Sequence, residues 1–368
     1  MSQFDTTDRP DRPPSRKPDG FKSFLLRAFL AFFLVVLLGA GAGFIYISSF
    51  LSRPGSLPGR DVEVVVRPNA SFASVAADLK ERGVISDVRR FILLAEWNKQ
   101  TGKLRVGRFM VNTGWQPSRV LELLISGSPI MDRITLPEGL TWWETGRRLE
   151  AAGLVLFQDF EKIIHDQEFL RYWGIPLDSA EGYLFPDTYL IPRPIQLDET
   201  SAKSVVGRLL DNFRRRVATL YDSDIKLGPS ERRQLANAVI LASIVEKETA
   251  QPFERARVAG VYINRLYRKM ILQADPTVIY GLGPDFSGPL RRSNLDNAAN
   301  AYNTYKHPGL PPGPICSPGL ASIRAALYPE THNYVYFVSR GDGSHQFSTD
   351  LASHNRAVQT YIQNQAAP

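Results

Sequence analysis

Hydrophobic and polar positions change their pattern along the 368-residue chain, and the first pattern is uninterrupted. Residues Ala28 to Ser52 are almost wholly apolar and contain no charged side chain. A helix of these 25 residues covers the ~30 Å hydrocarbon core of a bilayer with some tilt, at about 1.5 Å per residue. The pattern predicts an uncleaved transmembrane anchor. A cleaved signal ending near Ser48 and Ser49, or a buried helix of a soluble domain, is the alternative.

Charged residues flank this apolar segment unequally. Residues 1–27 carry six basic side chains against four aspartates, whereas the twenty residues after Ser52 carry three arginines. Membrane proteins keep their more basic flank in the cytoplasm. We therefore expect a cytoplasmic tail (1–27) and a single-pass transmembrane helix (28–52) in the cytoplasmic (inner) membrane. The remainder is expected on the periplasmic, or extracytoplasmic, side.

One local pattern occurs twice in the exported part. Residues 64–86 and 134–155 each run from β-branched residues through a Pro-containing loop and a hydroxyl residue into an amphipathic helix followed by glycine. A strand, a capped turn and a helix account for this pattern. We expect Ser71, Thr141 and, in a weaker third copy, Ser118 to cap their helices by accepting hydrogen bonds from first-turn amides.

These units predict the domain organisation after the membrane. Residues 53–60 are rich in Pro and Gly, which indicates a linker that holds the next domain off the bilayer. Residues 61–130 predict a small αβ module similar in pattern to LysM-type glycan-binding modules, with a structural platform as the alternative. Residues 131–368 form the larger domain. The chain is therefore expected to be an α+β protein behind one transmembrane helix.

The larger domain mixes helical and extended patterns. Residues 157–174 and 201–224 have the 3.6-residue period of amphipathic helices. Between them, Tyr183, Phe185 and Tyr189 alternate, so they share one face of an extended segment. Either a sugar-stacking platform or a buried core accounts for these aromatic residues.

The C-terminal third contains a long segment without regular structure. Residues 281–319 hold 13 Gly and Pro in 39 positions, which excludes a regular helix or central strand and favours an ordered loop that lines a site. After it, residues 334–365 predict a strand, a Gly-Asp-Gly turn, a second strand and a terminal helix.

The helix predicted over Leu235 to Ala250 carries the strongest chemical signal. It is apolar through Val245 and then presents Glu246 and Glu248, which lie about 200° apart and point to opposite sides. Glu248 continues an apolar stripe, where partial burial raises the pKa of a carboxyl group toward that of a general acid at neutral pH. Two solvated glutamates at a fraying helix end are the alternative.

Composition narrows the classes of function. The formal net charge is +7 without a dense Lys/Arg stripe, so we expect no nucleic-acid partner. The single cysteine, Cys316, has no intrachain partner, and the five histidines show no HExxH spacing. We therefore expect neither a metal nor an organic cofactor, and chemistry based on carboxylates, hydroxyls or amides.

Five motifs, in this order, carry a resemblance to one family. LASIVEKETA, VAGVYINRL, LQADPTVIYGLG, AYNTYKHPGLPPGPICSPG and YFVSRGDGSHQFSTDLASHN resemble the motif series of the YceG-like family, the endolytic murein transglycosylases. The resemblance extends from about residue 61 to the C-terminus, behind that family's single N-terminal anchor. It implies a mixed α/β catalytic domain over residues 131–368.

The resemblance also implies an activity. Glu248, the second glutamate of the E-K-E-T motif, corresponds to the catalytic acid. The implied reaction cleaves the β-1,4 bond between N-acetylmuramic acid and N-acetylglucosamine within nascent peptidoglycan strands. It leaves 1,6-anhydromuramic ends and limits strand elongation, with peptidoglycan synthases as implied partners. A muramidase-type hydrolase that uses Glu246 or Asp275 as a second carboxylate, or a non-catalytic glycan-binding scaffold, is the alternative.

Polar residues within and after the glutamate motif are candidates for binding sugar groups or for orienting Glu248. Turn formation is the alternative for the Asn and Thr residues among them. The candidates are Glu246, Asn264, Gln273, Asp275, Tyr280, Tyr302, Asn303 and Thr304.

Overall fold

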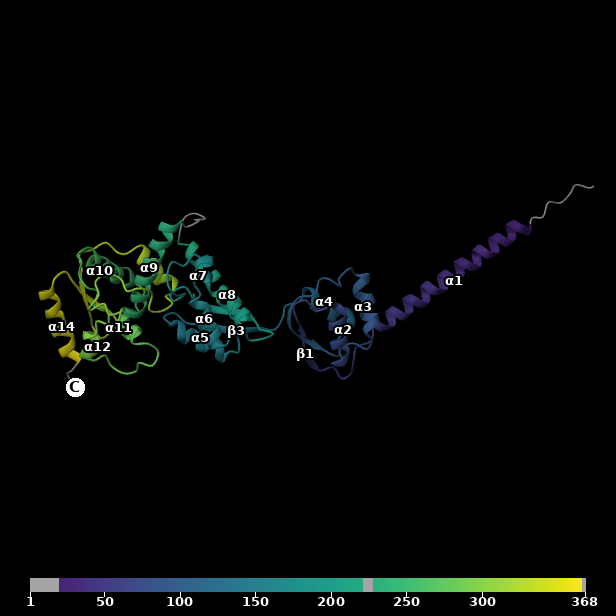
Figure 1. Cartoon of the computed structure of the whole chain (residues 1–368), viewed down its shortest axis with the longest axis horizontal. Coiled ribbons are helices and arrows are strands. Elements are labelled where there is room, and N and C mark those ends of the chain that lie inside the picture. The colour runs from purple at the N-terminus through teal and green to yellow at the C-terminus, as the bar shows by residue number, and fades with distance from the viewer. Residues whose placement is uncertain (1–19, 221–227, 366–368) are drawn as a thin grey trace, which may run out of the picture. The chain divides into compact units, whose positions relative to one another are not determined.

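The computed structural model describes residues 20–220 and 228–365, so that most of the expected cytoplasmic tail lies outside the described residues. The chain forms two compact units, Met1–Gly127 and Ser128–Pro368 (Figure 1). We call them unit 1 and unit 2.

Helix α1, Gly20–Leu51, contains the expected apolar segment. Its part from Phe24 to Leu51 is long and apolar enough to cross a membrane, and none of its most apolar window is buried within the protein. The expectation of one apolar N-terminal helix is confirmed. Its last turn is different, because Phe50 is only 1% exposed and belongs to the hydrophobic core of unit 1.

The rest of unit 1 packs three helices with a two-stranded antiparallel sheet. Val64 faces Phe109 across the sheet, and both side chains are fully buried. The elements are β1 (Asp61–Val66), α2 (Phe72–Glu81), α3 (Val88–Trp97), β2 (Gly107–Asn112) and α4 (Pro117–Ser126).

The Pro- and Gly-rich segment 53–60 lies on unit 1. The backbone N–H of Ser56 donates to the carbonyl of Thr113 (3.2 Å), and that of Arg60 donates to the Thr113 hydroxyl (3.0 Å). Gly55 approaches the Gly83 carbonyl so closely that an added Cβ would lie 2.3 Å from its oxygen. The segment therefore packs against the unit and does not hold it off α1 as a free spacer.

Two of the three expected helix caps are present. Ser71 accepts a hydrogen bond from the Ser74 amide, and Thr141 forms a reciprocal capping box with Glu144. The prediction for Ser118 was wrong, because α4 begins one residue earlier, at Pro117, and has no side-chain cap. Proline at the first helical position has no N–H to satisfy and its backbone angle already suits a helix.

Unit 2 contains most of the helices and two further antiparallel strand pairs, β3 with β4 and β5 with β6. The expected C-terminal order of strand, turn, strand and helix is confirmed. The elements are β3 (Met131–Leu136), α5 (Trp142–Ala151), α6 (Phe157–Ile164), α7 (Gln167–Trp173), β4 (Asp187–Pro192), α8 (Glu199–Ala218), α9 (Pro229–Glu248), α10 (Arg255–Tyr267), α11 (Asp275–Leu282), α12 (Arg292–Asp296), α13 (Leu320–Leu327), β5 (Tyr336–Ser339), β6 (His345–Ser348) and α14 (Leu351–Gln365).

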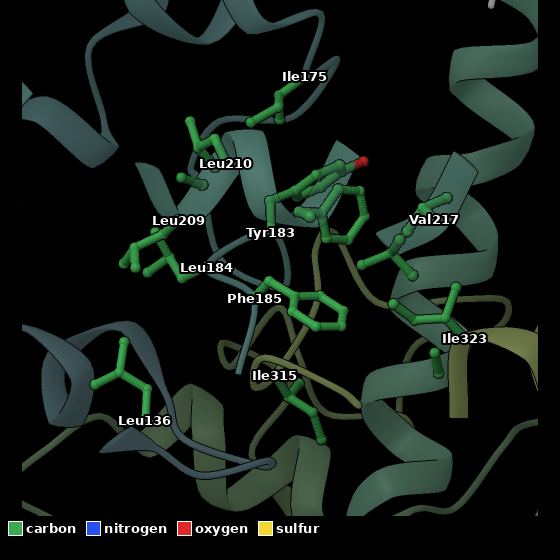
Figure 2. Packing of buried hydrophobic residues seen from close by; sticks show 14 of the residues in the cluster. Leu136, Ile175, Tyr183, Leu184, Phe185, Leu209, Leu210, Val217, Ile315 and Ile323 are labelled. Carbon is green, nitrogen blue, oxygen red and sulfur yellow. The ribbon is translucent and has the colours of Figure 1, made fainter. Parts of the chain in front are cut away.

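The alternating aromatic residues belong to the core of unit 2. Tyr183 and Phe185 are 5% and 4% exposed and both contact the ring of Phe213. Figure 2 shows Tyr183 and Phe185 among aliphatic side chains of the same cluster, including Leu210 and Val217. The core interpretation is therefore the right one for these aromatic residues, and they form no sugar platform.

Helix α9 runs through this core and packs against α10 and α13. Apart from Asn237, its residues from Leu235 to Val245 are buried. The Gly- and Pro-rich loop lies against it, because the Ser243 hydroxyl accepts a hydrogen bond from the Ile315 amide (3.0 Å). The core thus fixes both the end of α9 and the loop beside it.

Candidate active site

Glu248 is the last residue of α9 and is partly buried. Burial raises its pKa from 4.5 to about 7, and the negative charge of Asp275 adds to this rise. A hydrogen bond from Tyr262 and the nearby His345 and Arg265 side chains lower the pKa and only partly offset the rise. The direction agrees with the expectation from the apolar stripe. Glu248 therefore exchanges its proton near neutral pH, as a general acid and base must.

Tyr262 on α10 is the direct hydrogen-bond partner of Glu248. Its side chain is 2% exposed, and burial together with the charge of Glu248 raises the pKa of the phenol well above 10. The hydroxyl therefore keeps its proton and donates to the carboxylate throughout the physiological pH range. This bond orients Glu248 without competing for its proton.

Arg265 lies one turn after Tyr262 on the same helix and is 8% exposed. Its guanidinium donates to the backbone carbonyls of Val335 and Leu272, at 2.7 Å each. Burial lowers the pKa of Arg265, yet an arginine remains charged. Arg265 thus joins the segment before α11 to the segment before β5 and adds a positive charge near Glu248.

A buried carboxylate orients His345 at the start of β6. Glu254 is 2% exposed and accepts hydrogen bonds from the His345 amide (3.0 Å) and from Nδ1 of its ring (2.7 Å). Because Nδ1 donates to the carboxylate, this contact fixes the ring and its Nδ1 proton. The interaction of His345 with Glu248 lowers the pKa of that carboxyl group.

Asp275 is the predicted polar residue that the fold brings to Glu248. It begins α11 with an exposed side chain, and its carboxylate accepts a hydrogen bond from the Tyr305 hydroxyl (2.6 Å). The negative charge of Asp275 raises the pKa of Glu248. Burial raises the pKa of Tyr305, and the carboxylates of Asp275 and Glu248 add to this rise. Gln273 lies beside this group, exposed, with its side-chain oxygen 3.5 Å from Nη1 of Arg265.

Glu246 belongs to a different cluster. Its side chain is 8% exposed, accepts a hydrogen bond from the Gly319 amide (3.0 Å) and lies 3.7 Å from Arg255. Arg255 is also 3.9 Å from Glu138, whose pKa is raised by burial and by the charge of Glu246. Glu246 thus holds the loop before α13 against the end of α9.

The side-chain amide of Asn264 forms hydrogen bonds within the protein. Its Nδ2 donates to the backbone carbonyls of His332 (2.7 Å) and Tyr334 (2.9 Å). These bonds attach the segment before β5 to α10. Asn264 was expected near a sugar, and its hydrogen-bonding capacity is instead largely taken up within the protein.

Asn303 and Thr304 stabilise the Gly- and Pro-rich loop. Asn303 is fully buried, and its Nδ2 donates to the carbonyls of Leu295 (3.0 Å) and Asn297 (2.8 Å). The Thr304 hydroxyl accepts a hydrogen bond from the Ala274 amide (3.0 Å). The turn-forming alternative describes both residues, which shape the loop and do not line a surface.

Tyr280 and Tyr302 lie together in an aromatic cluster. The ring of Tyr280 stacks on Trp143 (centroids 4.9 Å apart) and meets Tyr302 at 4.8 Å. Its hydroxyl is hydrogen-bonded to Glu181, which is 1% exposed. Burial raises the pKa of Glu181 to about 8, although the Trp142 amide donates to its carboxylate (2.8 Å). Glu181 is therefore mostly neutral at pH 7.

Sequence reasoning missed Tyr262, His345 and Glu181 as site residues. For Tyr262 a signal existed, since it precedes Arg265 by three residues on an amphipathic helix and shares its face. His345 and Glu181 had no local signal, because their partners are distant in sequence. In residues 20–220 and 228–365, no group of three or more His, Cys, Asp or Glu side chains is arranged to hold a metal ion.

A carboxyl group with a pKa near 7, beside a buried tyrosine in a mixed α/β unit, is typical of enzymes that use general acid–base catalysis. The chain belongs to the YceG-like family, whose sequence model matches residues 64–360. The family expected from the five motifs is confirmed, and so is the mixed α/β fold.

Curated relatives support the same assignment. The chain is 28% identical over 341 residues to an endolytic murein transglycosylase of Bacillus subtilis, covering 88% of this chain and 91% of the relative. It is 25% identical over 371 residues to an endolytic murein transglycosylase of Streptococcus pneumoniae, covering 93% of this chain and 65% of that longer relative. Both relatives are named as members of the enzyme class that the motifs implied.

A solved structure is similar as well. The crystal structure of a YceG-like protein from Listeria monocytogenes has a TM-score of 0.51 and 26% sequence identity to this chain. The match covers 80% of this chain and 98% of the Listeria chain. The fold is therefore shared over most of both molecules.

Proposed function

We propose that this protein is an endolytic lytic transglycosylase of peptidoglycan. Its substrate is the β-1,4 bond between N-acetylmuramic acid and N-acetylglucosamine within a glycan strand, and its product is a 1,6-anhydromuramic end. The observation that carries the proposal is Glu248, a single carboxyl group with a pKa of about 7 at the end of a buried helix. The names of the curated relatives supply the substrate class.

One carboxyl group suffices for this chemistry. Neutral Glu248 gives its proton to the glycosidic oxygen as the bond from muramic C1 to that oxygen breaks, and the leaving sugar departs with a 4-hydroxyl. The Glu248 carboxylate then takes the proton of the muramic C6 hydroxyl while O6 bonds to C1. No water is consumed, and Glu248 ends the cycle protonated again.

Neighbouring residues prepare Glu248 for both steps. The permanent hydrogen bond from Tyr262 holds the carboxyl group in one orientation as its proton leaves and returns. The exposed carboxylate of Asp275 favours the protonated acid before the first step, and its negative charge stabilises the positive charge that develops at C1. Sugar groups of the strand are bound by Gln273, Asp275, Tyr280 and Tyr302. The segments around the site are held in place by hydrogen bonds of Asn264, Asn303 and Thr304.

A muramidase is the rival within the same substrate class. Hydrolysis ordinarily uses a second carboxylate, about 5 to 5.5 Å away for retention or 6.5 to 9.5 Å for inversion. Glu246 is engaged by Gly319 and Arg255, which favours a positioning role for it. Asp275 is the remaining candidate. Mass spectrometry separates the two reactions, because hydrolytic products carry one additional water.

The decisive experiment uses the purified full-length protein and isolated glycan strands. Wild type is expected to give anhydro ends, and Glu248→Gln to lose at least about a hundredfold of the rate, because general acid–base catalysis contributes that much or more. Glu161→Gln, which changes an exposed glutamate on α6, is the matched control and should keep full activity. Full activity of Glu248→Gln, or strand binding without new ends in wild type, would contradict the proposal.

We also propose the arrangement of the chain around this activity. Helix α1 anchors the protein once in the cytoplasmic membrane, with the basic tail inside and the chain after α1 outside. Residues 61–130 act as a LysM-like module that binds glycan, and residues 131–368 as the catalytic domain. Cleavage near the membrane limits the length of nascent strands, and peptidoglycan synthases are the expected partners.

A further inference from the structure

Helix α3 of unit 1 presents large apolar side chains that no described part of the chain covers. Leu93 is 47% exposed and Trp97 is 83% exposed. The opposite side of the same helix is buried in the core of unit 1 through Phe91, Leu94 and Ala95. An exposed tryptophan next to an exposed leucine on one helix face is a feature of surfaces that bind a partner or a membrane.

The exposed stripe begins where α3 meets α1. The guanidinium of Arg90 lies 3.6 Å above the ring centroid of Tyr46, near the end of α1. Arg90, Leu93 and Trp97 are spaced i, i+3 and i+7, so they follow one side of the helix. Figure 1 shows α3 beside the end of α1.

The position of Tyr46 sets the level of this stripe relative to a bilayer. A hydrocarbon core of about 30 Å takes up roughly 20 helical residues, which places its outer boundary near Ile47 when the span begins at Ala28. Tyr46 is then at the boundary between the acyl chains and the lipid headgroups. Because Phe50 is locked into the core of unit 1, the unit follows within one helical turn of that boundary.

Charge around the stripe complements an anionic surface. Residues 88–103 contain four basic side chains and one acidic side chain, Glu96, which gives a net charge of +3. Arg89, Lys99 and Lys103 are exposed. Basic residues near a bilayer are attracted to anionic headgroups, and tryptophan favours the interface between headgroups and acyl chains.

We propose that the Arg90–Leu93–Trp97 stripe of α3 rests on the anionic phospholipid surface of the same bilayer that α1 crosses. Trp97 and Leu93 enter the headgroup layer, and the basic side chains contact lipid phosphates. The contact keeps unit 1 seated on the membrane, at the level where nascent strands emerge. This inference rests on the proposed membrane anchoring by α1, and it is independent of the catalytic role of Glu248.

The test measures depth in the membrane at matched positions of the full-length protein. Leu93→Cys and Met110→Cys are each labelled with bimane in nanodiscs of phosphatidylglycerol and phosphatidylcholine that contain a headgroup nitroxide quencher. Both parent side chains are 47% exposed, and the native Cys316 is fully buried. We expect quenching several times stronger at position 93 than at position 110. Replacing Arg89 and Lys99 together by Glu should reduce quenching at position 93.

Each outcome bears on one claim. Failure of the protein to co-elute with the nanodiscs would overturn anchoring by α1, whereas co-elution with equal quenching at both positions would overturn the α3 contact alone. If quenching at position 93 is lost when each disc holds two copies of the protein, a second copy covers the stripe, and this would overturn the lipid contact. An unchanged signal in the double Glu variant would contradict recognition of anionic headgroups.

Discussion

At the scale of single residues, the chemistry of the protein depends on how deeply each carboxyl group is buried. Glu246 and Glu248 are separated by one lysine, yet the first is held by an amide and an arginine while the second faces Tyr262. Burial leaves Glu248 with a pKa of about 7, the value at which one group serves as acid and base in turn.

The first residue-scale prediction concerns pH. Glu248 must be protonated for the first step, so kcat/KM should fall as pH rises through about 7, the raised pKa. The negative charge of Asp275 contributes to the rise, so Asp275→Asn should move this break to lower pH. Asp285→Asn, at an exposed position on the loop after α11, should leave it unchanged. The same break in both variants would contradict the coupling of Asp275 to Glu248.

The second concerns Glu181, whose pKa is raised from 4.5 to about 8 by burial. Below about pH 4.5 the folded and unfolded chains both hold this proton, but between the two values the unfolded chain releases it first. The free energy of unfolding therefore declines with rising pH in this window. Glu181→Gln should lose this component, so its thermal midpoint relative to wild type should rise from pH 5 to pH 8.5. A constant difference would contradict the burial of the acid.

At the scale of elements, α9 fixes the loop that borders the candidate site. Ser243 makes the link through its hydroxyl, which donates to the Ile240 carbonyl (2.7 Å) and accepts from the Ile315 amide (3.0 Å). The residue is fully buried. Removing the hydroxyl takes this hydrogen-bond partner away from the Ile315 amide.

Ser243→Ala should therefore destabilise unit 2 by about 1–3 kcal/mol, the cost of leaving a buried amide without a partner. Ser322 is the matched control, because it is equally buried on α13 and its hydroxyl has no hydrogen-bond partner among the described residues. Ser322→Ala should be close to neutral. Thermal unfolding of the two variants decides the matter, and equal losses would contradict the proposed link.

At the scale of the whole molecule, the last turn of α1 belongs to the hydrophobic core of unit 1. Phe50 is 1% exposed although it belongs to the last turn of α1, whereas Phe44 on the same helix is 74% exposed. The chain between them therefore passes from an exposed apolar surface to a protein interior within two turns. The segment after it is also packed on unit 1 through Ser56 and Arg60.

Phe50→Ala should destabilise unit 1 by about 3–5 kcal/mol, the usual cost of truncating a buried phenylalanine. Phe44→Ala removes the same atoms from an exposed position and should leave the stability of unit 1 unchanged. Resistance of residues 61–127 to protease as a function of temperature, in detergent-purified protein, measures both effects. Equal midpoints for the two variants would place Phe50 outside the core.

Features that depend on neighbouring residues could be predicted from the sequence alone. The apolar run after Ala28, the capped helices beginning near Ser71 and Thr141, and the buried helix ending at Glu248 were all evident from periodicity and end signals. Local composition decides these features because helix formation and capping act within a few residues. The family assignment followed from motif order and was also available before the structure.

The polar groups that surround Glu248 could not be predicted from the sequence, because they come from distant segments. Glu254 and His345 are 91 positions apart, and Asn264 reaches carbonyls about 70 positions away. The aromatic residues Tyr183 and Phe185 were equally compatible with a platform or a core until their burial was known. Burial and hydrogen-bond partners determine the pKa of a side chain and whether its polar groups are free to bind a ligand. Both depend on packing between segments that are distant in sequence, so no local pattern predicts them.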